Sequence, residues 1–152
     1  SEVRQAWFDV SARNPAESLA ALDKGLSATL DALAARKIPV VLLLQSPLQS
    51  RLPATCVVRL GEAACGEDAA RFRSLTRNVT ERLKAIAHRY PAVTVLDPAA
   101  IQCDAKRCPA ALDGHIGYYD SEHVTASTAR SPRSLALWDA ALQAAQNSWV
   151  SQ

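Results

Sequence analysis

Apolar residues recur every three or four positions in three long stretches of the chain, which is the spacing of amphipathic helices. The stretches are residues 14–37, residues 67–90 and the segment that begins near Pro132. Their apolar positions are Leu19, Leu22, Leu26, Leu30 and Leu33, then Phe72, Leu75, Val79, Leu83 and Ile86, and finally Leu135, Trp138, Leu142 and Trp149. We therefore predict three helices, each with one apolar side.

Local signals mark the ends of these helices. Asn14, Pro15 and Glu17 supply an N-cap, a first-turn proline and a reciprocal capping acid for the first helix. Pro91 stops the second helix, and Ser131 can cap the third. The three helices are thus separate elements.

Two apolar segments between the helices have the length of strands. Residues 38–44 form an uninterrupted apolar run, which predicts a strand covered on both faces, as in a parallel sheet. Pro39 stands at its beginning, where a missing N–H is tolerated. Residues 93–96 form a second strand, and residues 3–8 are a candidate third.

The order helix, strand, helix, strand, loop, helix predicts a single α/β domain over residues 1–152, with a parallel sheet between layers of helices. Such sheets usually have about five strands. We therefore expect upstream strands of the same domain to be absent from this sequence; the alternative is a small three-stranded α/β protein. Residues 48–66 are expected to form a loop, and residues 101–120 a hairpin or an extended loop.

Composition narrows the possible partners. Hydrophobic residues make up 49% of the 152 residues and charged residues 21%, as in folded globular proteins. The formal net charge is +2 and the basic residues are dispersed, so nucleic acid is not an expected partner. No apolar run approaches the about 18 residues that span a bilayer, and the first residues given do not combine a basic segment with an apolar one, so we expect neither a membrane span nor a signal peptide within this sequence.

The four cysteines fall into two close pairs, Cys56 with Cys65 and Cys103 with Cys108. We favour two local disulfides, which persist in an oxidising compartment such as the periplasm. A zinc site is less favoured because neither pair has the C-x-x-C spacing and residues 104–107 offer no further typical ligand set. Four reduced cysteines without a special role are the remaining alternative.

One segment combines side chains suited to acid–base chemistry. Asp120 and His123 lie three residues apart in an irregular stretch before the last helix. A carboxylate that accepts from Nδ1–H would leave Nε2 free to take a proton from a serine, as in a Ser-His-Asp triad. The stretch follows strands whose carboxyl ends share one edge of the sheet, where the active sites of α/β proteins lie. Alone, however, an Asp-x-x-His pair is more often a surface cap.

Three segments of the chain resemble the last block of SGNH hydrolase domains. They are Cys103–Cys108, the stretch Tyr118-Tyr119-Asp120-Ser121-Glu122-His123-Val124-Thr125, and Ala129-Arg130. The resemblance is to the group fused behind the membrane domain of family-3 acyltransferases, which modify O-antigen, lipopolysaccharide and other cell-surface polysaccharides. Three upstream matches are looser: Ala6-Trp7-Phe8 to a strand end that carries a tryptophan, Val40–Pro47 to the next strand and its proline loop, and Pro53 with Cys56 to a Pro-x-x-Cys connection.

The resemblance implies an SGNH-hydrolase-like, flavodoxin-like fold with His123 as general base and Asp120 as the acid that orients it. The family's nucleophile lies in a Gly-Asp-Ser block near the start of the domain, and this sequence contains no Gly-Asp-Ser. The glycine and asparagine oxyanion residues are missing as well, and Thr128 stands where the family favours glycine. We therefore expect the serine and the oxyanion groups to lie outside this chain.

Other candidate residues have simpler interpretations. Ser46 precedes Pro47 and lacks the glycines of a nucleophile elbow, so it is interpreted as a turn serine. Trp7 is a candidate for lining the substrate cleft, although core packing is the simpler role. His88 and His115 are assigned to the surface, and Asn78-Val79-Thr80 matches a glycosylation sequon that we disregard.

Three functions remain open. The first is O-acyl transfer, usually of acetyl, from an acyl donor to a sugar hydroxyl of a polysaccharide, without a metal or a diffusible cofactor. The resemblance places such a domain in the periplasm, as the soluble part of an inner-membrane protein whose membrane domain delivers the acyl group. The second is ester hydrolysis by the same triad, and the third is a non-catalytic module that binds polysaccharide or the membrane domain.

Overall fold

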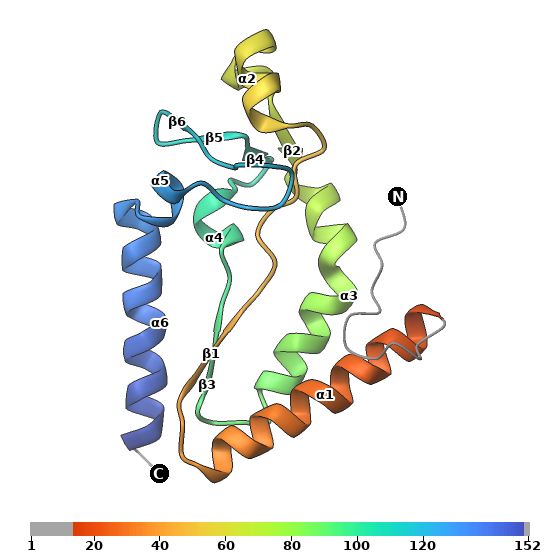
Figure 1. Cartoon of the computed structure of the whole chain (residues 1–152), viewed down its shortest axis with the longest axis vertical. Helices are drawn as coiled ribbons and strands as arrows, with labels where there is room; N and C mark the ends of the chain where they lie inside the picture. The colour runs from red at the N-terminus through yellow and green to blue at the C-terminus, as the bar shows by residue number, and fades with distance from the viewer. Residues whose placement is uncertain (1–13, 151–152) are drawn as a thin grey trace.

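The computed structural model describes residues 14–150, and the side chains of residues 14–148 (Figure 1). The candidate strand at residues 3–8 and the candidate cleft residue Trp7 lie outside this range. The main elements follow the predicted order: α1 (Pro15–Ala35), β1 (Val40–Leu43), α3 (Ala69–Ala87), β3 (Val93–Leu96) and α6 (Pro132–Val150).

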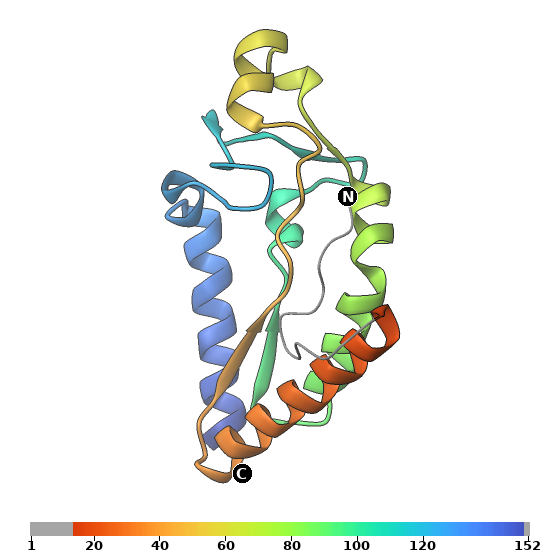
Figure 2. The same ribbon diagram turned by 45° about the vertical axis from the view of Figure 1, so that its right-hand side comes forward.

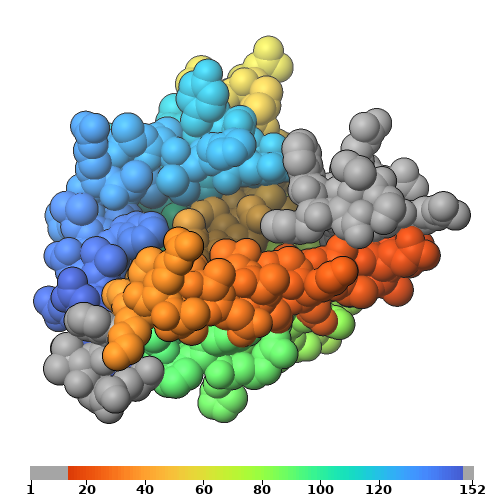
Figure 3. All heavy atoms as spheres, turned by 60° about the horizontal axis from the view of Figure 1, so that its bottom comes forward, coloured from red at the N-terminus to blue at the C-terminus, as the bar shows by residue number. Residues whose placement is uncertain are grey.

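These elements form three layers, as the α/β prediction requires. Helix α6 packs on one side of β1 and β3, and α3 packs against β3 from the other side (Figures 1 and 2). Helix α1 lies beside α3 across one end of the molecule (Figure 3). A bidentate pair between Arg82 of α3 and Asp23 of α1 joins the two helices.

The sheet between the layers is parallel and short. Strands β1 and β3 pair in register from Val40 with Val93 to Leu43 with Leu96. One further backbone bond, from the Leu44 N–H to the Leu96 carbonyl at 2.9 Å, extends the ladder. Both strands therefore point toward the same end of the molecule, where β1 leads into residues 45–52.

The prediction that residues 38–44 are covered on both faces is wrong: the described part of the chain, residues 14–150, leaves several of their side chains exposed. The side chains of β1 are only partly buried, and Ile38 and Leu43 are 42% and 49% exposed. The reason is that no described strand pairs with the outer edge of β1, while the helices contact β3 more than β1.

Side-chain caps define where helices α1 and α3 begin. The Asn14 side chain accepts from the N–H of Glu17 at 3.0 Å, which is the expected N-cap, and the Glu17 carboxylate accepts from the Asn14 side-chain amide at 2.8 Å rather than from its backbone N–H. Helix α3 starts at Ala69, slightly later than predicted, because the Asp68 carboxylate accepts from the N–H of Arg71 and caps it. Leu75 was predicted on the buried stripe of this helix but is 62% exposed.

The predicted loop at residues 48–66 contains a helix instead. Helix α2 (Pro53–Leu60) is followed by a 3-10 turn, η1 (Glu62–Ala64). Pro53 occupies the first turn, where its missing N–H is harmless, and eight residues are too few to show a clear apolar period. A disulfide between Cys56 and Cys65 joins α2 to the residue after η1.

Short antiparallel strands connect this region to the second cysteine pair. Strand β2 (Gly66–Asp68) pairs with β4 (Arg107–Pro109), which follows α4 (Ala99–Gln102). A Cβ on Gly66 would lie 2.8 Å from the Cys108 carbonyl oxygen, so the close approach requires glycine. The two strands thereby bring both disulfide loops together.

The predicted hairpin within residues 101–120 is present. Strands β5 (Ala111–Leu112) and β6 (His115–Ile116) pair antiparallel around Asp113 and Gly114, both at positive φ. A two-residue Asp-Gly turn with positive φ at both positions matches the right-handed twist of the strands. The chain then continues through residues 117–125 into α5 (Ala126–Ala129).

Helix α6 packs on the sheet through small residues. Ser131 caps it, as predicted, by accepting from the N–H of Ser134 at 3.2 Å. Its buried residues are Ser134, Ala141 and Ala145. Three of its large apolar residues are exposed instead: Leu135, Trp138 and Leu142 are 51%, 37% and 47% exposed, while Leu137 is half-buried. Within the range that the structure describes, no helix is long and apolar enough to cross a membrane.

Candidate active site

The candidate site is the tight turn that carries Asp120 and His123. An antiparallel bridge pairs Tyr118 with Val124, and the N–H of Tyr119 donates to the carbonyl of His123 at 2.7 Å. These contacts fold residues 118–124 back on themselves. The spacing of three residues thus brings the carboxylate and the imidazole together, as the sequence predicts.

The two side chains are joined directly. His123 Nδ1 lies 2.8 Å from Asp120 Oδ2 and 3.1 Å from Oδ1. Asp120 Oδ1 also accepts from the backbone N–H groups of Glu122 and His123, both at 2.8 Å. The carboxylate therefore fixes both the turn and the imidazole, and the Nδ1–H tautomer is the one that it favours.

Electrostatics within the turn favour an ionised acid and a basic imidazole. The hydrogen bonds from the Glu122 N–H, the His123 ring and the His123 N–H lower the pKa of Asp120 to about 2. The hydrogen bond to Asp120, and then its charge, raise the pKa of His123 above its ordinary value of 6.5. Asp120 is thus an anion at neutral pH that stabilises the imidazolium.

The free side of the imidazole is open. The His123 side chain is 76% exposed, and its Nε2 makes no hydrogen bond to any residue between 14 and 150. Ser46 is half-buried in the loop after β1 and makes no side-chain hydrogen bond with another described residue. Nε2 is therefore free for a proton donor that the described residues do not supply.

The turn lies at the carboxyl end of β1, where the active sites of α/β proteins collect. The backbone N–H of Gln49, six residues beyond the end of β1, donates to the carbonyl of Ser121 at 2.8 Å. Sequence reasoning did not single out Gln49, because a lone glutamine in a loop carries no local signal of such a contact.

Thr125 and Thr128 connect the turn to its neighbouring segments through hydrogen bonds. Thr125 caps α5 by accepting from the N–H of Thr128 at 3.3 Å, and its hydroxyl donates to the carbonyl of Ile116 at 3.0 Å. Thr128 is buried and its carbonyl accepts from the hydroxyl of Ser134 at 2.6 Å. Thr128, which stands where the family favours glycine, is thus buried and hydrogen-bonded at the junction of α5 and α6.

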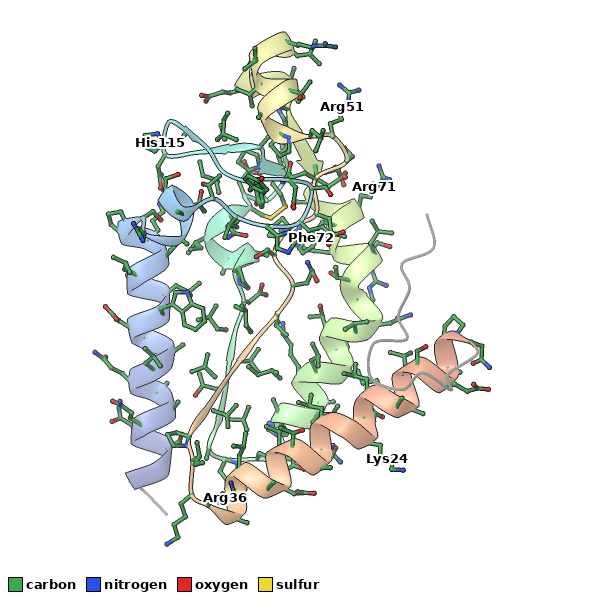
Figure 4. The ribbon with its side chains drawn as sticks, in the orientation of Figure 1. Lys24, Arg36, Arg51, Arg71, Phe72 and His115 are labelled. Carbon is green, nitrogen blue, oxygen red and sulfur yellow. A yellow bond between two sulfur atoms is a disulfide. The ribbon has the colours of Figure 1, made fainter. Side chains whose placement is uncertain are left out.

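The cysteines form the two predicted pairs near this site. Cys103 and Cys108 are joined as a disulfide, and the ring of Phe72 packs with Cys108 in one buried cluster (Figure 4). The second disulfide, between Cys56 and Cys65, was described above. Sulfurs bonded to each other are not thiolate ligands, so the zinc alternative has no support here. Among residues 14–150, no group of three or more His, Cys, Asp or Glu side chains is placed to hold a metal ion.

The other histidines lie away from the turn. His115 occupies the β5–β6 hairpin, at the outer side of the molecule (Figure 4), and His88 ends α3; both are exposed. The structure therefore brings together Asp120 and His123 and leaves the remaining histidines apart.

Comparison with known families agrees with this geometry. The family model described as "SGNH domain (fused to AT3 domains)" matches residues 3–135, which include both cysteine pairs and the Asp120 turn. No curated protein and no solved structure matches the chain. Membership supports a general acyl-transfer or esterase-like role and the α/β fold. The chain belongs to the SGNH domain family, in the group fused to AT3 domains.

Proposed function

We propose that this domain transfers an acyl group, usually acetyl, to a hydroxyl of a bacterial cell-surface polysaccharide by a serine mechanism. The observation that carries the proposal is the 2.8 Å contact between Asp120 and His123 Nδ1, together with an Nε2 that no described residue engages. This is the arrangement of the acid and base in a Ser-His-Asp triad.

The chemistry proceeds in two halves. His123 Nε2 accepts the proton of a serine hydroxyl as the serine oxygen attacks the acyl carbonyl, and the imidazolium then gives that proton to the leaving group of the donor. In the second half His123 deprotonates the sugar hydroxyl as its oxygen attacks the acyl-serine ester, and the imidazolium then returns that proton to the departing serine oxygen, which restores the serine and the neutral imidazole. Asp120 stays ionised throughout and stabilises the imidazolium in each half.

The serine and the oxyanion donors are proposed to come from a preceding segment of the same domain. The outer edge of β1 has no partner among the described strands, and Leu43 of β1 is 49% exposed. A further parallel strand on this edge would bury Leu43 and would end beside the Asp120 turn. We refer to this chain together with that segment and any attached membrane domain as the complete protein.

The proposed location is the periplasm, with the domain attached to an inner-membrane acyltransferase domain that supplies the acyl group. The two disulfides support an oxidising compartment. The family description, which names a fusion to AT3 domains, supports the attachment.

Hydrolysis is the second candidate, because an imidazole that is open to solvent can activate water as readily as a sugar hydroxyl. The two reactions share the acyl-serine intermediate and differ only in the acceptor. Release of free acetate in the presence and absence of polysaccharide separates them: transfer requires acetyl to appear on the sugar.

The proposal is tested by ester hydrolysis in the complete protein. We expect His123→Ala to lower kcat by about 10³-fold or more, because the serine then has no base. His115→Ala is the matched control, since His115 is another exposed histidine outside the turn, and it should leave kcat unchanged. Equal activity in the two variants would show that His123 is not the base. The lack of an encoded upstream Gly-Asp-Ser, with no ester hydrolysis, would instead favour a non-catalytic binding module.

A further inference from the structure

Gln49 lies where three segments of the chain meet. It follows β1, its side chain is buried at 5% exposure, and its backbone N–H donates to the carbonyl of Ser121. Its side-chain Nε2 lies 3.4 Å from the carbonyl oxygen of Cys108. One residue thus connects the loop after β1, the Asp120 turn and strand β4.

The hydrogen bond from Gln49 to Ser121 differs from the other hydrogen bonds of the turn. The other hydrogen bonds of residues 119–123 stay within those five residues. In the part of the chain that the structure describes, the Gln49 N–H is the one group that ties them to a segment outside the motif. Ser121 lies between Asp120 and His123, so this bond restrains the position of both residues relative to the loop after β1.

The other end of the connection is rigid. Cys108 is fully buried, is bonded to Cys103 and pairs with Glu67 in the β2–β4 ladder. A buried glutamine needs hydrogen-bond partners, and the Cys108 carbonyl is a fixed one. Through its side chain Gln49 is held to β4, and through its backbone it holds the turn.

Tyr118 completes the buried surroundings. The Tyr118 side chain is fully buried, which raises the pKa of its hydroxyl, and an interaction with the Gln49 side chain offsets part of that rise. The Gln49 carboxamide therefore lies between two buried residues, Tyr118 and Cys108, and its contact with the Cys108 carbonyl is made away from solvent.

We propose that Gln49 is a positioning residue of the reaction, acting through the Ser121 carbonyl to hold the Asp120–His123 pair at the carboxyl end of the sheet. It does not touch the reacting atoms. The inference rests on the proposed function and extends it to a residue beyond the triad.

The test compares two glutamine variants in the complete protein. Gln49→Leu keeps the side-chain volume and the backbone N–H but removes the donor to Cys108. Gln45→Leu makes the same chemical change at an exposed position of the same loop and is the control. Gln49→Asn, whose amide is one methylene shorter, is the milder second variant.

We expect Gln49→Leu to lower kcat about 10-fold or more while KM stays within about twofold, because a misplaced base weakens the reaction more than it weakens binding. In protein selectively labelled with ¹⁵N-histidine, the pKa of His123 should fall toward 6.5, since its contact with Asp120 loosens. The His123→Ala spectrum assigns the resonance. Gln49→Asn should show smaller changes in the same directions.

The inference is overturned if Gln49→Leu matches Gln45→Leu in both kcat and the His123 titration. It is also overturned if both Gln49 variants lose their far-ultraviolet circular dichroism, because Gln49 would then be a general folding residue. The titration needs no turnover, so it decides on Gln49 even if His123→Ala stays active and the proposed function fails. A silent Gln49 with an inactive His123→Ala would remove the inference alone.

Discussion

The two ends of the molecule are held together in different ways. Around the Asp120 turn, in residues 45–68 and 99–129, two disulfides, three short antiparallel pairings and the Gln49 connection join segments distant in the sequence. In the sheet region, formed by β1, β3 and α6, two strands carry the core and large side chains such as Leu43 and Trp138 remain exposed. The site geometry is thus fixed locally, whereas the sheet region leaves large apolar side chains exposed.

The acid–base pair and the proposed nucleophile therefore depend on different contacts of the molecule. The acid and base of the turn are positioned by bonds inside the described chain, so their contact does not need the rest of the sheet. The proposed nucleophile does need it, because it would arrive on a strand that pairs with β1. Four changes, taken from the largest expected effect to the smallest, test this division.

Asp120→Asn should have the largest effect, lowering kcat of the complete protein about 10²- to 10⁴-fold. Asparagine keeps the oxygen that accepts from the Glu122 and His123 N–H groups, so the turn should persist. The charge that raises the pKa of His123 is lost, and because the neutral imidazole is the base, the acid limb of kcat/KM should move to lower pH. A limb that stays in place would show that His123 does not limit the reaction.

Removal of the Cys56–Cys65 disulfide should lower the free energy of unfolding by about 2–3 kcal/mol, because a closed loop restricts the unfolded chain. The change is made as Cys56→Ala with Cys65→Ala and measured by urea denaturation. Opening the shorter Cys103–Cys108 loop should cost somewhat less by the same argument. It should, however, also weaken activity through Gln49, which the Cys56–Cys65 variant should not.

Leu43→Lys tests the sheet region. In the 152-residue chain this half-exposed leucine should tolerate lysine within about 0.5 kcal/mol. In the complete protein the same change should cost about 2 kcal/mol, because the proposed neighbouring strand would bury the charge. The comparison uses thermal unfolding of both forms, with Leu75→Lys on α3 as a matched exposed leucine. Equal costs in both forms would argue against a strand on this edge.

Tyr118→Phe should have the smallest effect, within about 0.5 kcal/mol of the wild-type free energy of unfolding and on the stabilising side. The hydroxyl is buried without a hydrogen bond in the described range, so its removal leaves no partner unpaired. A loss above about 1 kcal/mol in urea denaturation would show that the hydroxyl has a partner after all.

Sequence patterns predicted the elements that local signals determine. The Asn14 cap, a hairpin within residues 101–120 and the Asp120–His123 contact all depend on residues within a few positions of each other, and the structure contains each of them. Both cysteine pairs are also local, and each bridge closes fewer than ten residues.

The predictions that proved wrong or incomplete concern features that depend on contacts between residues distant in the sequence. Leu43 and Leu75 have the spacing of core residues, but which face of an element is covered depends on the neighbours that the fold supplies. Helix α2 was missed because eight residues begun by Pro53 resemble a loop. Gln49 could not be found at all, since its partners Cys108 and Ser121 lie more than fifty residues away.

The most direct test of the central claim is to map where a fluorophosphonate, which traps activated serines, reacts with the complete protein. The account predicts one adduct, found by peptide mass spectrometry on a serine of a Gly-Asp-Ser segment that precedes this chain. Labelling should fall sharply in His123→Ala and remain unchanged in His115→Ala. An adduct on Ser46, no adduct, or labelling that does not depend on His123 would contradict the account.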